Sequence, residues 1–92
     1  MSTVWLLLGM YEGRPLIPAA DVARDFFGHL GGEKLIRKVD AGDIDLPLIR
    51  IENSSKAARY VDVRDLAAYL DARSREAREL VAKVHGRRTG DG

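Results

Sequence analysis

Two helix patterns separated by a short glycine-rich turn constrain the fold of this chain more than any other feature. The first pattern, over residues 18–27, has its apolar side chains on one face, namely Val22, Ala23, Phe26 and Phe27. The segment GHLGG, residues 28–32, then reads as a turn. A second helix is predicted over about residues 33–41, with Gly42 as its end. Two helices joined by so short a turn pack against each other, which is typical of a helix-turn-helix.

A hairpin and a long helix are predicted after these two helices. Alternating apolar and polar residues in DIDLPLIRIE indicate a half-buried strand, and RYV indicates a returning strand. The apolar strand positions would be Ile49, Ile51, Val61 and Val63. Asp62 reads as an N-cap, so a long helix is predicted over about residues 62–85. A hairpin placed after a helix-turn-helix predicts a winged helix-turn-helix.

Two elements precede the first helix pattern. Apolar residues between Val4 and Tyr11 recur at helical spacing, with Thr3 as the expected N-cap and Gly13 as the stop. The segment RPLIP reads as a brief extended stretch, because a residue before proline avoids the helical region. Four aromatic residues of the first half are expected in the core, namely Trp5, Tyr11, Phe26 and Phe27.

The chain is long enough for one domain and not for two. It has 92 residues, and its hydrophobic fraction of 46% supports a packed core. The expected fold class is α+β, mainly α: a winged helix-turn-helix with a long C-terminal helix. We expect residues 1–86 to form this single domain and residues 87–92 to form a flexible tail.

The composition argues against an enzyme or a membrane protein. There is no cysteine, which excludes disulfides, thiol chemistry and sulfur-ligated zinc. His29 and His85 lie far apart, and no combination of acid, base and nucleophile is present. We therefore expect no catalytic residue, no cofactor and no metal. The apolar run VWLLLGMY is too short to cross a bilayer and lacks the features of a signal peptide, so a cytoplasmic protein is expected.

The second predicted helix carries three basic residues on one face. With Lys34 at zero and about 100° per residue, Arg37 and Lys38 lie within about 60° of it. The apolar residues of this helix fall on the other side, namely Leu35, Ile36 and Val39. Such a helix suits the major groove of DNA, where arginine can bond guanine edges and lysine can meet phosphates.

The hairpin is expected to carry a second set of DNA contacts. Its basic and small hydroxyl residues suit the phosphate backbone beside the groove. They are Arg50, Ser54, Ser55, Lys56 and Arg59. Asp40, Asp43 and Asp45 nearly cancel this charge, so the hypothesis requires them to lie behind the helix.

The long helix has an apolar repeat beyond its first turns. Val63, Leu70, Ala77 and Val84 recur every seven residues, with Leu66 and Leu80 between them and Arg73 as an interruption. The first half would serve the core. The second half would either bind a second copy of the chain, forming a homodimer, or fold back on the N-terminal helix.

The chain also resembles a known family over Thr3 to Ala77. The similarity lies in WLLLGMYEG, in LIPAADVARDFFGHL and in EKLIRKVDAGDIDLPLIRIENSSKAARYVDVRDLAAYLD. These segments resemble the pyocin activator protein family of small bacterial transcription activators. The same region is similar to excisionase and MerR-type winged helices, a comparison that places Lys34, Arg37 and Lys38 on the recognition helix and Lys56 at the wing.

The resemblance implies sequence-specific binding to a promoter in double-stranded DNA, activation of pyocin or prophage genes, and no enzymatic activity. RNA polymerase is then an expected partner. Two alternatives stay open from the residues: an excisionase-like architectural protein that bends DNA, and a protein-interaction module such as an anti-repressor.

Overall fold

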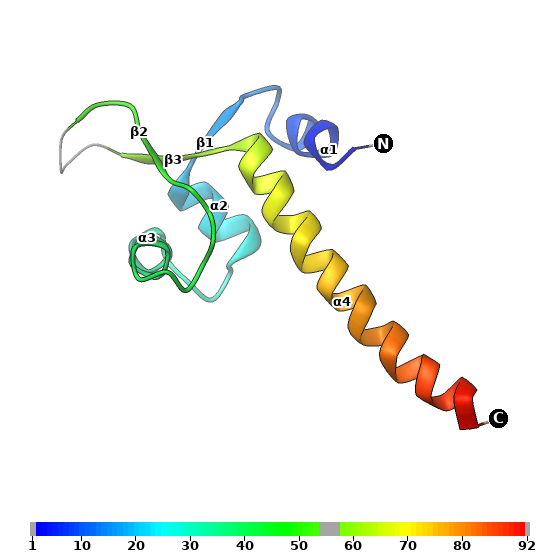
Figure 1. Cartoon of the computed structure of the whole chain (residues 1–92). Helices are drawn as coiled ribbons and strands as arrows, with labels where there is room; N and C mark the ends of the chain where they lie inside the picture. Colours follow the sequence, from blue (N-terminus) through cyan, green and yellow to red (C-terminus); the bar gives the residue numbers. More distant parts are fainter. Residues whose placement is uncertain (1, 54–57, 92) are drawn as a thin grey trace.

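The computed structural model describes residues 2–53 and 58–91, with side chains as far as residue 86 (Figure 1). Its elements are α1 (Thr3–Met10), β1 (Leu16–Pro18), α2 (Ala19–Phe26), α3 (Gly32–Asp40), β2 (Ile49–Arg50), β3 (Arg59–Asp62) and α4 (Val63–Asp91). The predicted α+β, mainly helical class with a long C-terminal helix is confirmed. Among the described residues, no helix is both long enough and apolar enough to cross a membrane.

The three strands form one small antiparallel sheet in the order β1-β3-β2. The predicted hairpin is present, with Ile49 opposite Tyr60 and Arg50 opposite Arg59. The segment expected only to be extended is a third strand, in which Ile17 pairs with Val61. Because β3 pairs with both β1 and β2, the β2–β3 hairpin is joined to β1 and through it to the rest of the fold.

Two of the expected strand positions are wrong. Ile51 lies beyond the end of β2 and is 66% exposed, so it is not the buried half of an alternation. Val63 is the first residue of α4 and not part of β3. The chain changes direction there because Asp62 Oδ1 accepts a hydrogen bond from the Arg64 N–H at 2.8 Å, which is the N-cap interaction expected of Asp62.

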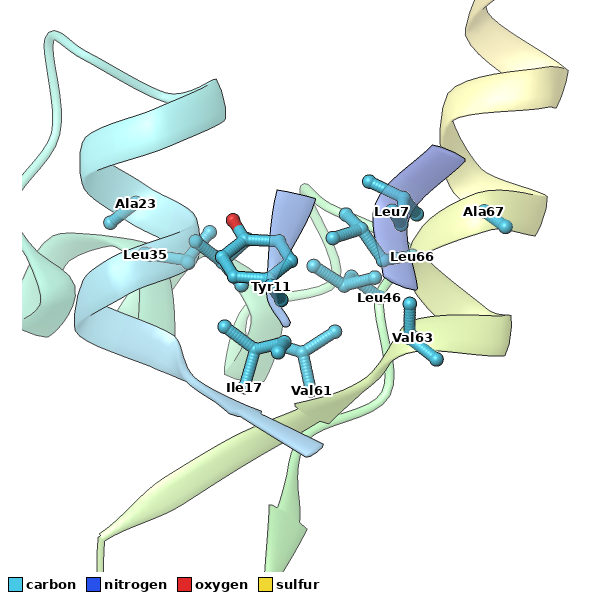
Figure 2. Close-up of a cluster of buried hydrophobic side chains, with 11 residues drawn as sticks. Leu7, Tyr11, Ile17, Ala23, Leu35, Leu46, Val61, Val63, Leu66 and Ala67 are labelled. Atoms are coloured by element: carbon cyan, nitrogen blue, oxygen red, sulfur yellow. The ribbon is translucent and has the colours of Figure 1, made fainter. Parts of the chain in front are cut away.

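The core lies between the sheet and the first turns of the helices (Figure 2). Ile17 and Val61 contribute side chains from the sheet, and Leu66 contributes one from α4. Leu35 is the buried residue of α3, and Leu46 comes from the loop that follows α3. These five side chains are at most 1% exposed, so α3 and the hairpin share one packed interior with α4.

The N-terminal helix is present but differs in detail from the prediction. Its N-cap is Ser2, not Thr3, because the Ser2 hydroxyl accepts from the Trp5 N–H at 3.4 Å. Tyr11 is buried as expected, whereas Trp5 is 67% exposed, so its expected place in the core is wrong. Helix α1 is apolar on all sides, and only the side that carries Leu7 faces the core.

The long helix has a packed half and a projecting half. Its first turns pack on the core, and Thr3 Oγ1 of α1 donates to Asp71 Oδ1 at 2.5 Å. Every residue from Arg73 to Gly86 is exposed. Figure 1 shows this half of α4 extending away from the packed domain formed by the rest of the chain, which we call the body. The alternative in which this half folds back on the N-terminal helix is therefore wrong. The helix also continues past residue 85, to Asp91.

Candidate nucleic-acid interface

Helix α3 is divided into a core side and a basic side, as its sequence predicts. Leu35 is fully buried, and Ile36 and Val39 are partly buried. Lys34, Arg37 and Lys38 are all exposed. The basic face, defined here as Lys34, Arg37 and Lys38, therefore points its charges to solvent while the other side of the helix anchors it.

A close approach between α2 and α3 fixes the position of the basic face. Gly32, the first residue of α3, lies against Ala20 of α2. A Cβ atom at residue 32 would lie 3.2 Å from Ala20 Cα and 3.3 Å from its Cβ, which is tighter than ordinary contact. Glycine is therefore the residue that lets the two helices meet at this distance. By contrast, a Cβ at Gly31, the N-cap, would meet no atom within 4 Å.

A polar network ties α2 to the turn after α1. The Tyr11 hydroxyl donates to Asp25 Oδ2 at 2.7 Å, and Arg24 Nε donates to Asp25 Oδ1 at 3.0 Å. The Arg24 hydrogen bond, followed by the Tyr11 hydrogen bond, lowers the pKa of Asp25. Burial, followed by the bond to Asp25, raises the pKa of Tyr11. The periodicity of the sequence did not reveal this network, because its Tyr11–Asp25 bond joins residues 14 positions apart.

The base of the hairpin is joined to the end of α3 by an ion pair. Arg59 Nη1 lies 3.5 Å from Asp40 Oδ1, and the Arg59 side chain is only 17% exposed. Arg50 lies directly opposite Arg59 in the sheet, so the two side chains share one face of the ribbon. The expected place of Asp40 behind the helix is wrong, because Asp40 lies between α3 and the hairpin.

A shallow groove separates α3 from the hairpin. Its volume is about 360 Å³, and it is lined by Pro18, Ala19, Ala20, Gly32, Glu33, Ile36, Ala58 and Arg59. Ile36 lines this groove and Asp40 pairs with Arg59, so these two residues mark the side of α3 that faces the hairpin. At 100° per residue, that side is about a third of a turn around the helix from the centre of the basic face. The hairpin thus flanks α3 on the side next to Arg37.

Five of the eight predicted contact residues fall within the described chain. Four of them are exposed, namely Lys34, Arg37, Lys38 and Arg50. Arg59 is largely covered and paired with Asp40. Ser54, Ser55 and Lys56 lie outside the described residues. The structure therefore brings α3 and the base of the hairpin together on adjoining sides of one surface, which we call the α3–hairpin surface.

Comparisons with known proteins connect this chain to one family. Neither curated proteins nor solved structures gave a match. A family model described as pyocin activator protein PrtN matches residues 3–77, a range that includes α1, the sheet, α2, α3 and the packed half of α4. This match supports a regulatory role in activating pyocin genes. The chain belongs to the pyocin activator protein family.

Proposed function

We propose that the protein activates pyocin genes as a sequence-specific double-stranded DNA-binding transcription activator. The observation that supports this most directly is the exposed basic face of α3 beside the hairpin. We interpret the arrangement as a winged helix-turn-helix, with α3 as the recognition helix and the hairpin as the wing.

In this proposal the basic face enters the major groove. Arg37 is the one arginine of the face, and a guanidinium can make two hydrogen bonds to a guanine edge. Lys34 and Lys38 both lie on the side of Arg37 away from the hairpin and would meet phosphates, which position the helix without reading sequence. The fully buried Leu35 anchors this helix to the core, so the basic face would keep its orientation in the complex.

The hairpin adds contacts to the neighbouring backbone. Arg50 is exposed at the end of β2 and would meet a phosphate. Ser54, Ser55 and Lys56 are assigned to the same backbone from their sequence. Arg59 is assigned a weaker direct contact, because Asp40 already holds its guanidinium. An activator bound in this way would recruit RNA polymerase to the promoter.

The test is a binding titration with two DNA duplexes, one from a promoter upstream of pyocin genes and one of the same composition in scrambled order. Fluorescence anisotropy at several salt concentrations should show tighter binding to the promoter and a strong loss of affinity with salt. Salt-dependent binding without promoter preference, with protection of recombination sites instead, would favour the excisionase-like alternative. A stable protein complex with no salt-dependent DNA affinity would favour the interaction module.

A further inference from the structure

The projecting half of α4 carries an apolar stripe that no other described part of the chain covers. The distal stripe consists of Ala77, Leu80, Val81 and Val84. Leu80 is 64% exposed, Val81 55% and Val84 45%. At 100° per residue, all four lie within about 60° of Ala77. A lone helix of this length is marginal in water, so a partner would bury the stripe and also stabilise the helix.

Arg73, which interrupts the repeat in the sequence, is drawn aside from this stripe. Its Nη2 donates to Glu76 Oε1 at 2.6 Å, and its guanidinium carbon lies 5.4 Å from the centre of the Tyr69 ring. Glu76 and Tyr69 both lie at the edge of the stripe, about 80–100° from Ala77. The interruption therefore leaves the face from Ala77 to Val84 open.

We infer that the distal stripe binds the distal stripe of a second copy of this chain, with the two helices antiparallel. The inference does not depend on DNA binding. It depends on the exposed stripe, on the place of the body relative to it, and on the charges at its edge.

The position of the body relative to the distal stripe determines how the two α4 helices can be oriented. Leu66 is fully buried in the core and Leu70 is partly buried, and both lie within about 20° of the Ala77 direction. The packed domain is therefore on the stripe side of α4, and Figure 1 shows it at the amino-terminal end of this helix. Parallel helices would place both bodies at the same level in the space between them. Antiparallel helices place the bodies at opposite ends, and only the projecting halves overlap.

The charges on one edge of the stripe are complementary in the antiparallel orientation. A two-fold axis between Leu80 and Val81 sets Ala77 level with Val84 of the second copy. Glu76 and Lys83 lie on the same edge of the stripe, about 100–120° from Ala77. The axis brings Glu76 of each copy close to Lys83 of the other copy, within two residues along the helix. Two complementary ion pairs result, one on each side of the axis.

Sedimentation velocity of the full chain at micromolar concentrations tests the association. The wild-type chain should sediment as a dimer. The double variant Leu80→Gln with Val84→Gln should raise the dissociation constant at least about tenfold, because it removes aliphatic area from the centre of the contact. The control variant Arg75→Gln with Glu79→Gln keeps the net charge and alters the opposite face, so its dissociation constant should match the wild type. A wild-type monomer, or equal weakening by both variants, would overturn the inference.

Disulfide trapping tests the orientation, since the chain has no cysteine of its own. Under mild oxidation, Ala77→Cys mixed with Val84→Cys should give a covalent dimer that contains one chain of each kind. Neither single variant should cross-link efficiently with itself. Efficient self-linking of Ala77→Cys would show parallel helices and overturn the antiparallel arrangement.

Discussion

The guanidinium of Arg59, at the base of the hairpin, lies 3.5 Å from the carboxylate of Asp40, at the last residue of α3. This pair joins the two elements to which we assign DNA contacts. It also places a negative charge beside the basic face and the base of the hairpin. Asp40 is 57% exposed, so water competes with Arg59 for its carboxylate, and in the proposed complex a DNA phosphate would compete for Arg59.

Removing the Asp40 charge should therefore strengthen DNA binding. Asp40→Asn leaves the Arg59 charge available to phosphate, so affinity should rise a few-fold on any sequence and the salt dependence should steepen by about one unit of slope. The folding free energy should change by less than about 1 kcal/mol, because the pair is partly exposed. Anisotropy titrations at several salt concentrations measure both quantities. Asp43→Asn, an exposed acid in the next loop, is the matched control, and weaker binding by Asp40→Asn alone would contradict this account.

Arg37 should determine base preference. In Arg37→Ala the affinity for the promoter should fall by about 1–3 kcal/mol, while binding to scrambled DNA should fall much less, if the guanidinium reads a guanine. Arg75→Ala removes an exposed arginine from the projecting half of α4 and should leave the preference intact. An equal loss of affinity for both duplexes would show that Arg37 contacts phosphate and does not read a base.

The contact between Gly32 and Ala20 should be sensitive to any added side chain. In Gly32→Ser the new Cβ requires the Ala20 backbone to shift by a few tenths of an ångström, and we expect the free energy of unfolding to fall by about 1–3 kcal/mol. Gly31→Ser places the same residue one position earlier, in open space at the N-cap, where it should raise stability by a few tenths of a kcal/mol. Urea denaturation of the two variants provides the comparison. The assigned packing is incorrect if the two serines have the same effect.

Acid should destabilise the fold in part through Asp62. A hydrogen bond from the Arg64 side chain, and then one from its backbone N–H, hold the pKa of Asp62 below its ordinary value of 3.8. A lowered pKa in the folded state adds stability above the unfolded value, and that stability is lost as the pH falls through the folded pKa. Between neutral pH and about pH 3, the melting temperature of Asp62→Asn should fall less than that of the wild type. Asparagine keeps an N-cap side chain but does not titrate. An equal fall in melting temperature for both proteins would show that the titration of Asp62 does not contribute to acid destabilisation.

The elements with a clear period were predictable from the sequence. The division of α3 follows from helical spacing alone, because Leu35, Ile36 and Val39 centre on the side of the helix opposite the centre of the basic face. Asp62 was predictable for a similar reason, since aspartate before an apolar helical pattern is a local signal.

Other features depend on contacts between distant parts of the chain. Strand β1 has only three residues and ends in proline, so its pairing with β3 leaves almost no period to detect. Trp5 could not be placed because α1 is apolar on every side. The pair between Asp40 and Arg59 joins residues 19 positions apart, and only the folded arrangement of α3 and the hairpin brings them together.

The most direct test of the central claim is an NMR titration of the ¹⁵N-labelled chain with the promoter duplex. We predict that chemical-shift changes and line broadening concentrate at Lys34, Arg37, Lys38 and Arg50, and that the exposed residues Arg75 and Glu79 of α4 change little. Changes centred on α1 or on the projecting half of α4, with the basic face unaffected, would contradict the proposal that the α3–hairpin surface binds DNA.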